Sequence, residues 1–425
     1  MMIHVVTPGE TPAAIAGRYG IPLSRLLADN ELDPNQPLVV GQTLVILFAD
    51  QTYTVQPGDT LDTVAERYGT TVNQLFRNNP QLGGNPTLYP GQTLVINYMQ
   101  ERQGTVSING YAYPFIQPST LQRTLPYLTG LSVFSYGFEA DGTLVPADDE
   151  AMLAAAATYG VSPILVLTTL SRAGVFRSEL AGQLLNDMAL QQQVIDSVIA
   201  VMVEKGYDGV DVDFEFIPAG NAANFAAFVE RLAARTREVG KFTMVALAPK
   251  TSADQPGLLY EAHDYAAIGA VADYVLLMTY EWGYTYSPPM AVAPLNRVRQ
   301  VLEFGVTQIP PEKIFMGIPN YGYDWPLPFQ RGETKARTIG VVEAVDIARQ
   351  YGAEIQFDST AQSPFFNYTD ENGTAHEVWF EDARSIERKL ALIPELGLRG
   401  ASYWTIMRWF PQNWAVLNAL YNIQQ

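Results

Sequence analysis

The sequence from Val106 onward alternates between short β-prone apolar runs and longer helical patterns, and this alternation constrains the fold most strongly. Eight such units in about 320 residues predict an α/β fold, a (β/α)8 TIM barrel over residues 104–425. The expected helices carry Asp or Asn at capping positions and include Asp148–Tyr159, Leu190–Lys205, Asn221–Val239 and Asp382–Leu396. The expected strands are Val106–Tyr111, Leu131–Tyr136, Ile164–Leu170, Gly209–Glu215, Thr243–Ala248, Tyr274–Tyr280, Ile314–Pro319 and Gly400–Thr405.

The stretch between the seventh and eighth expected strands is too long for an ordinary βα loop. It contains three short β-prone pieces, Glu354–Asp358, Phe365–Tyr368 and Glu377–Phe380. We therefore expect a small α+β insertion over about residues 322–378, forming one wall of a cleft at the barrel mouth.

The first hundred residues contain two copies of one pattern. Residues 6–11 (Val-Thr-Pro-Gly-Glu-Thr) correspond to residues 55–60 (Val-Gln-Pro-Gly-Asp-Thr), and Gly-Gln-Thr-Leu-Val-Ile occurs at both 41–46 and 91–96. Each copy combines a strand pattern, two short helical patterns and a second strand pattern. We expect two βααβ modules, over residues 1–49 and 50–98, ahead of the barrel.

Charge and composition exclude several function classes. The chain has 26 Lys+Arg against 44 Asp+Glu, a formal net charge of −18 with no basic run, which argues against a nucleic-acid partner. It has no cysteine, and His4, His263 and His376 show no ligand spacing, so we expect no metal and no other cofactor. The apolar runs are too short for a membrane span, and the first residues lack a signal-peptide pattern. The oligomeric state stays open.

The fourth expected strand carries acidic residues with the two-residue period of a strand. Residues 208–215 read Asp-Gly-Val-Asp-Val-Asp-Phe-Glu, so Asp211, Asp213 and Glu215 should all face the barrel axis. Burying three carboxylates costs free energy, which packing alone does not explain. Crowded carboxylates raise one another's pKa and so keep a general acid protonated. An EF-hand calcium loop has a different spacing, with Gly at position 6 and Glu at position 12.

This segment resembles the Asp-x-x-Asp-x-Asp-x-Glu signature of family 18 glycoside hydrolases. The resemblance implies that Glu215 protonates the glycosidic oxygen, Asp213 orients the 2-acetamido group of the substrate and Asp211 tunes Asp213. It assigns Asp208 and Gly209 a structural part in the motif. No second carboxylate is apparent on an opposite strand, so we expect the substrate's own acetamide to act as the nucleophile, with net retention.

Two other strand ends carry residues similar to those of the same family. Residues 278–282 read Met-Thr-Tyr-Glu-Trp and resemble the family's Met-x-Tyr-Asp, with Glu281 in place of the usual Asp. The resemblance implies that Tyr280 hydrogen-bonds the acetamide oxygen, and Met278 and Glu281 are further candidates for substrate binding. Trp404 matches the aromatic floor beneath the sugar.

Weaker matches and departures complete this comparison. Tyr321 and Tyr111 are candidate substrate aromatics, and each is equally well interpreted as a packed side chain. Tyr323 stands where chitinases often carry Arg, and Thr-Thr-Leu at residues 168–170 replaces their Ser-x-Gly-Gly. These departures argue against an ordinary chitinase.

The two N-terminal copies resemble LysM modules. Residues 53–96 match the Tyr-x-Val-x-x-Gly-Asp-Thr-Leu start, the central Asn and the Leu-x-x-Gly-Gln-x-Leu-x-Ile end, whereas the first copy has Glu10 and Pro12 at two of these positions. The resemblance implies binding of N-acetylglucosamine-containing glycans, either peptidoglycan or chitin, in a groove between two loops. Each candidate could instead be a simple turn residue. The candidates are Gly9, Thr11 and Asn30 in the first copy and Gly58, Asp59, Thr60, Asn79 and Pro80 in the second.

The whole arrangement resembles the spore cortex fragment-lytic N-acetylglucosaminidases of endospore formers. This resemblance implies hydrolysis after N-acetylglucosamine in cortex peptidoglycan during germination. It also implies a protein made in the mother-cell cytoplasm and associated with the spore coat or cortex. Two alternatives stay open: a chitinase or endo-N-acetylglucosaminidase of the same mechanism, and a glycan-binding protein whose barrel no longer catalyses. The presence of Glu215 argues against the second.

Overall fold

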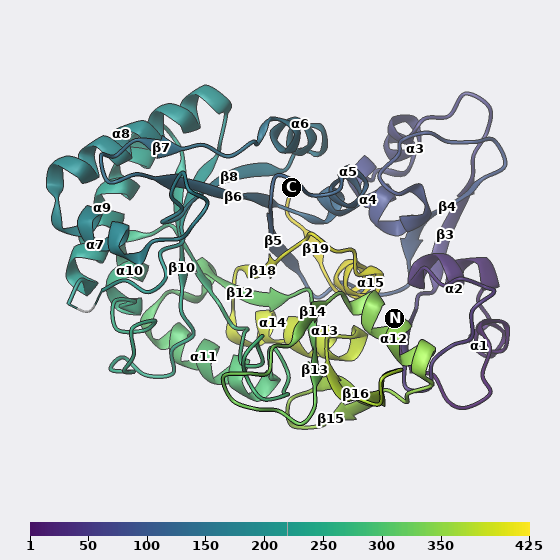
Figure 1. Ribbon diagram of the computed structural model, residues 1–425. Helices are drawn as coiled ribbons and strands as arrows, with labels where there is room; N and C mark the ends of the chain where they lie inside the picture. Colours follow the sequence, from purple (N-terminus) through teal and green to yellow (C-terminus); the bar gives the residue numbers. More distant parts are fainter. Residues whose placement is uncertain (219) are drawn as a thin grey trace.

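A closed barrel of eight parallel strands forms the larger part of the protein (Figure 1). The structure is a computed structural model that describes residues 1–218 and 220–425. Strand β18 pairs with β5 and closes the barrel, which confirms the predicted fold class and all eight expected strands. In order around the barrel these are β5 (Thr105–Ala112), β6 (Gly130–Phe138), β8 (Ser162–Leu167), β9 (Gly209–Val212), β10 (Phe242–Leu247), β11 (Tyr274–Leu277), β12 (Ile314–Pro319) and β18 (Gly400–Trp404).

Several strands end earlier than the sequence pattern predicts. Strand β9 pairs with β10 only from Gly209 to Val212, and β11 ends at Leu277. Beyond these points the chain leaves the hydrogen-bonded ladder at the carboxyl edge of the barrel. Asp213 keeps one backbone bond, from its N–H to the carbonyl of Leu167 at 3.0 Å. The acidic side chains therefore stand at the barrel mouth, where barrel enzymes carry their catalytic groups.

Helices cover the outside of the barrel, and the four expected helical segments all form. The segment ending at Leu396 is divided in two, because Pro394 cannot donate a hydrogen bond to the carbonyl of Leu390. Tyr421 donates to that carbonyl instead, at 3.0 Å. In the described part of the chain, no helix combines the length and apolar character needed to cross a bilayer. The helices are α5 (Pro118–Thr124), α6 (Glu150–Tyr159), α7 (Ser178–Asn186), α8 (Met188–Lys205), α9 (Ala222–Glu238), α10 (Tyr265–Val271), α11 (Leu295–Gln308), α13 (Ala383–Leu390), α14 (Leu392–Leu396) and α15 (Pro411–Leu420).

An α+β insertion lies between β12 and β18. Its five strands form an antiparallel sheet in the order β14-β13-β17-β16-β15, and helix α12 (Val341–Tyr351) packs against it. The three β-prone pieces named above correspond to its last three strands. The five strands of the insertion are β13 (Gly322–Pro326), β14 (Arg337–Ile339), β15 (Gln356–Asp358), β16 (Ser363–Thr369) and β17 (Ala375–Trp379).

Two βααβ modules lie together on one side of the barrel, coloured purple to blue in Figure 1. Each module has the expected βααβ order, and its first and last strands pair antiparallel. The first module contains β1 (Met2–Val5), α1 (Pro12–Tyr19), α2 (Leu23–Asn30) and β2 (Thr43–Ile46). The second contains β3 (Ala49–Thr54), α3 (Leu61–Tyr68), α4 (Val72–Asn78) and β4 (Thr93–Tyr98).

The second module is docked onto the barrel and shares its hydrophobic core. The side-chain amide of Gln74 donates to the side chain of Asn418 at 2.9 Å, and the guanidinium of Arg77 donates to the carbonyl of Pro126 at 2.7 Å. Phe76 packs against Tyr159 of the barrel. Because all these groups are buried, removing the modules would uncover apolar barrel surface. Point substitutions are therefore better probes of the modules than truncation.

The first module meets the insertion through a close backbone approach. The N–H of Ile355 donates to the carbonyl of Val40 at 2.9 Å. Gly41 has φ +85°, and a Cβ there would lie 1.9 Å from the carbonyl oxygen of Ile355. Glu31 accepts a hydrogen bond from the indole of Trp409 at 2.8 Å and pairs with Arg123. The orientation of the first module is thus set by specific contacts.

We predict that Gly41→Ala destabilises the protein far more than Gly91→Ala, its counterpart in the second copy. Gly91 has a similar φ of +88°, but a Cβ there meets nothing within 4 Å. Gly91→Ala should therefore cost only the backbone strain of about 1 kcal/mol, whereas Gly41→Ala adds a steric conflict worth about 2 kcal/mol more. Chemical denaturation measures both. Equal losses in the two variants would contradict the docked arrangement.

Candidate active site

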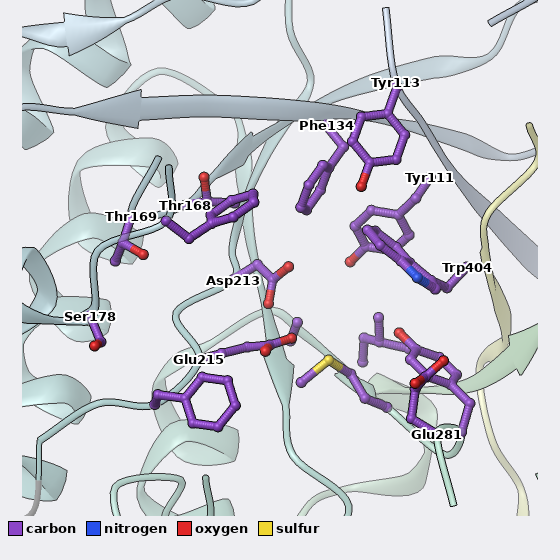
Figure 2. A pocket seen from close by; sticks show the side chains of 16 residues that line it. Tyr111, Tyr113, Phe134, Thr168, Thr169, Ser178, Asp213, Glu215, Glu281 and Trp404 are labelled. Atoms are coloured by element: carbon purple, nitrogen blue, oxygen red, sulfur yellow. The ribbon is translucent and has the colours of Figure 1, made fainter. Parts of the chain in front are cut away.

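A cavity of about 520 Å³ opens at the carboxyl ends of the barrel strands (Figure 2). Its wall includes Asp213 and Glu215, which follow β9, and Met278 and Tyr280, which follow β11. Trp404, the last residue of β18, also lines it. Residues predicted from separate parts of the sequence thus meet in one cavity.

The acidic column on β9 has the alternation that the strand period predicts. Asp211 is fully buried below the cavity, Asp213 is half-buried at its floor, and Glu215 opens into it. Phe214 points the other way and stacks on Phe225 and Phe228 of α9. This outward packing fixes the strand's register, so the acids have no other face to occupy.

Asp211 has a single hydrogen-bonding partner among the described residues. The hydroxyl of Tyr111 donates to one of its carboxylate oxygens, and the other oxygen is buried without a partner. Burial raises the pKa of Asp211 to about 7, although the bond from Tyr111 favours its charged form. Tyr111, predicted as a possible substrate aromatic, lines the cavity and also donates a hydrogen bond to the Asp211 carboxylate.

The pKa values of the upper two acids are raised as well. Burial is the main cause for Asp213, and the charges of Glu215 and Asp211 add to the effect. For Glu215 the main cause is limited hydration in the cavity wall, followed by the charge of Glu281. A raised pKa keeps Glu215 protonated at a higher pH than a free carboxyl group, as a general acid requires.

Glu281 brings a further carboxylate into the same cavity. From the sequence, Glu281 was a candidate for substrate binding only, and the structure places its carboxylate in the same cavity wall as Glu215. Glu281 follows β11 with φ +66°, a backbone conformation that turns it toward β13. The hydroxyls of Tyr321 and Tyr323 both donate to its carboxylate, Tyr323 at 3.1 and 3.3 Å. Tyr321 thus contacts Glu281 and does not line the catalytic cavity.

Aromatic rings surround Trp404 and complete the cavity wall. Tyr111 lies edge-on to Trp404 with centroids 5.6 Å apart, and Phe134 does so at 4.9 Å. Tyr113 and Phe134 were missed in the sequence, although Tyr113 lies two residues after Tyr111 and follows the same alternation rule. Phe176 and Phe216 also line the cavity, and their loop positions carried no periodic signal.

The predicted glycan-binding asparagines of the modules have a structural role instead. Asn30 and Asn79 are 2% and 0% exposed. The side chain of Asn79 donates to the carbonyls of Leu75 and Val95 and accepts from the N–H of Val95. Asn30 makes the equivalent three bonds. Each Asn joins a helix to the final strand, so its buried side-chain amide is already hydrogen-bonded within the module.

The other predicted module residues form turns and caps. Gly9 and Gly58 have φ of +80° and +91°, which only glycine adopts easily. Thr11 and Thr60 accept backbone bonds as the N-caps of α1 and α3. Asp59 accepts from the N–H of Gln56 at 2.7 Å and from the hydroxyl of Tyr53 at 2.5 Å, and Pro80 begins a short 3-10 helix.

Asp208 and Gly209 lie at the amino end of β9, away from the cavity. Asp208 is partly exposed and pairs with Lys241 at 3.0 Å. A Cβ at Gly209 would lie 2.2 Å from the ring of Phe242, so packing requires glycine there. Across the described ranges, no three His, Asp or Glu side chains are grouped so that they could hold a metal ion.

We predict that Asp211→Asn gains stability relative to wild type as the pH rises. The folded protein holds the Asp211 proton up to about pH 7, whereas an unfolded carboxyl group loses it near 3.8. The wild type therefore loses unfolding free energy between these values, and the variant escapes a loss of about 2–4 kcal/mol between pH 4 and pH 8. Urea unfolding at several pH values measures it, with the partly exposed Asp208→Asn as control. A stability difference that does not change with pH would refute the burial argument.

Comparison with known proteins places the chain in a family. The model of glycosyl hydrolases family 18 matches residues 179–408, and the LysM domain model matches residues 4–47 and 53–97. A cortical fragment-lytic enzyme of Bacillus subtilis is 41% identical over 433 residues, covering 100% of this chain and 99% of that protein. The crystal structure of the Bacillus cereus spore cortex-lytic enzyme SleL has a TM-score of 0.84 at 37% identity, covering 100% of this chain and 98% of that one. A chitinase of Chromobacterium violaceum has a TM-score of 0.68 at 25% identity, covering 73% of this chain and 98% of that one. The protein therefore belongs to family 18 of the glycosyl hydrolases, is a glycoside hydrolase, and carries two LysM domains.

Proposed function

We propose that this protein is a retaining, substrate-assisted N-acetylglucosaminidase that cleaves after N-acetylglucosamine in peptidoglycan, specifically in spore cortex fragments. The observation that carries the proposal is the meeting of Asp213, Glu215 and Tyr280 above the buried Asp211, in a cavity walled by Trp404. This set can protonate a leaving group and hold an acetamide at the same time.

Glu215 acts as the general acid in the first step. Its raised pKa keeps the proton available, and the carboxyl group gives that proton to the glycosidic oxygen as the bond to the anomeric carbon breaks. The leaving sugar departs with a new hydroxyl group. Glu215 is left as a carboxylate and can accept a proton in the second step.

Asp213 and Tyr280 position the nucleophile. One buried oxygen of Asp213 has no partner among the described residues, so it can accept a hydrogen bond from the acetamide N–H. Burial and nearby carboxylates raise the pKa of the Tyr280 phenol, which therefore stays a donor for the acetamide oxygen. Held in this way, the acetamide oxygen bonds to the anomeric carbon and forms an oxazolinium ion. Water activated by Glu215 opens this ion and returns the original anomeric configuration.

Peptidoglycan of the spore cortex is the substrate that the relatives favour. A cortical fragment-lytic enzyme and a spore cortex-lytic enzyme match this chain over nearly their full lengths. Two LysM domains beside the catalytic barrel would raise the effective concentration of an insoluble glycan at the cavity. We propose on the same grounds that the protein acts in association with the spore.

A chitinase is the second candidate, because a chitinase shares the barrel fold and the proposed mechanism leaves the neighbouring sugar unspecified. The two candidates differ in the sugar that follows the cleaved bond. Products of cortex fragments and of chitin oligomers therefore separate them directly. A glycan-binding protein without activity would give no products from either.

Glu215→Gln should retain its fold and lose turnover by at least about 10³-fold, because the amide cannot donate the proton that the leaving group needs. Mass spectrometry of products from purified cortex fragments and chitin oligomers measures the loss. Asp208→Asn is the matched control, since Asp208 lies away from the cavity. Fragments with a reducing N-acetylglucosamine, formed from cortex by wild type only, would support the proposal. Cleavage of chitin alone would favour the chitinase, and full activity of Glu215→Gln would overturn the mechanism.

Glu281→Gln should move the alkaline limb of the pH–rate profile to lower pH. The charge of Glu281 helps to raise the pKa of Glu215, so its removal lets Glu215 lose its proton at a lower pH. The profile of kcat/KM against pH measures the shift. Tyr323→Phe keeps the charge of Glu281 and removes one of its donors, so it should not move the limb in this direction. An unchanged limb in Glu281→Gln would show that Glu281 does not act on Glu215.

A further inference from the structure

A second hollow of about 470 Å³ adjoins the catalytic cavity. The two share Tyr113, Glu281 and Trp404 as common walls, so they form one continuous depression. The barrel supplies part of the hollow, and Tyr323 and Thr338 of the insertion supply the facing side. The hollow is large enough for a sugar and its substituent.

The position of Glu215 decides which end of a glycan enters this hollow. Figure 2 shows Thr169 and Ser178 on one side of Asp213 and Glu215, and Trp404 and Glu281 on the other. The general acid must face the leaving sugar, which is the reducing side of the cleaved bond. The non-reducing part of the glycan therefore continues past Trp404 into the hollow, which Glu215 does not line.

An aromatic pair, the exposed Phe115 and the half-buried Tyr113, forms part of this hollow. Phe115 is 73% exposed, and its ring stacks on Tyr113 with centroids 5.1 Å apart. Exposing an apolar ring to water costs free energy, so Phe115 suits a surface that a ligand covers. Such a ring offers a flat face to a pyranose.

Arg408 is the only basic residue among the described residues that line either the hollow or the catalytic cavity. Its backbone is fixed, because the side chain of Asn320 donates to its carbonyl at 2.7 Å. The neighbouring Arg337 pairs with Asp324 and Glu343, whereas Arg408 has no carboxylate partner in the part of the chain that the structure describes. An unpaired guanidinium on a protein of net charge −18 suits an acidic ligand group.

We propose that this hollow binds the muramyl residue on the non-reducing side of the cleaved bond, and that Arg408 recognises its acidic substituent. The inference rests on the proposed function: when N-acetylglucosamine occupies the catalytic cavity, the preceding sugar of an alternating glycan is muramyl. Its 3-O-lactyl group ends in a carboxylate or in a peptide that carries carboxylates. Chitin has only a hydroxyl group at this position, so Arg408 would be a specificity-determining residue for peptidoglycan.

The test compares two soluble tetrasaccharides of alternating muramyl and N-acetylglucosaminyl residues, one with free lactyl carboxylates and one with these converted to methyl amides. Wild type, Arg408→Ala and Arg408→Lys are assayed for kcat/KM on both, and on chitotetraose. Arg297→Ala is the matched control, because Arg297 lies on α11 and, among the described residues, its side chain hydrogen-bonds only to Gln300. Any effect of the leaving muramyl residue is common to all the variants and cancels in the comparison.

Arg408→Ala should lower the preference for the carboxylate form by about 5- to 30-fold, with Arg408→Lys between it and wild type. Its activity on the amide form and on chitotetraose should fall less than its activity on the carboxylate form, and Arg297→Ala should stay within about twofold of wild type on all three. Added salt should weaken the wild-type preference. Equal effects of Arg408→Ala on the two forms, or no effect, would overturn the inference.

A failure of the proposed function has a different signature. Wild type would then cleave chitotetraose and neither peptidoglycan form. Calorimetric binding of both forms to Glu215→Gln, with and without Arg408→Ala, decides the role of Arg408 in that case also. Tighter binding of the carboxylate form that disappears with Arg408→Ala supports the inference, and equal affinities contradict it.

Discussion

The burial of a column of carboxylates at the barrel mouth is the constraint on which the rest of the site depends. Among the described residues, the Asp211 carboxylate has one hydrogen-bond donor, Tyr111, and no cationic partner, so burial holds its pKa near 7. The charges of Glu215 and Asp211 in turn add to the effect of burial and raise the pKa of Asp213. The barrel can sustain the free-energy cost of burying these carboxylates because the other side of the same segment is firmly packed. There Phe214 stacks on the rings of α9.

Residues outside β9 set the charge around the acidic column and form the neighbouring walls. Glu281 adds a negative charge held by two tyrosine hydroxyls, with no basic group among the described lining residues of the cavity, so it raises the pKa of Glu215. The insertion contributes one of those tyrosines and a wall of the neighbouring hollow. The docked LysM domains keep a fixed orientation toward this cleft, because their contacts with the barrel are buried and specific. Specific contacts therefore connect the catalytic barrel, the insertion and the two LysM domains.

The sequence predicted what depends on local periodicity and missed what depends on tertiary contacts. Alternation along one strand identified Asp211, Asp213 and Glu215, and the same rule applied to β5 would have found Tyr113. Nothing local predicted that Glu281 turns into the cavity, since its position depends on a left-handed backbone and on tyrosines forty residues away. Asn79 looked like a loop residue because its partners on β4 lie sixteen residues later.

The configuration of the first product is the most direct test of the proposed mechanism. Proton NMR during early turnover of a cortex-derived oligosaccharide distinguishes the two anomers before they equilibrate in water. Substrate assistance predicts that the β-anomer of the new reducing N-acetylglucosamine appears first. First appearance of the α-anomer would contradict the account, because inversion requires a carboxylate such as Glu281 to activate water on the opposite face of the sugar.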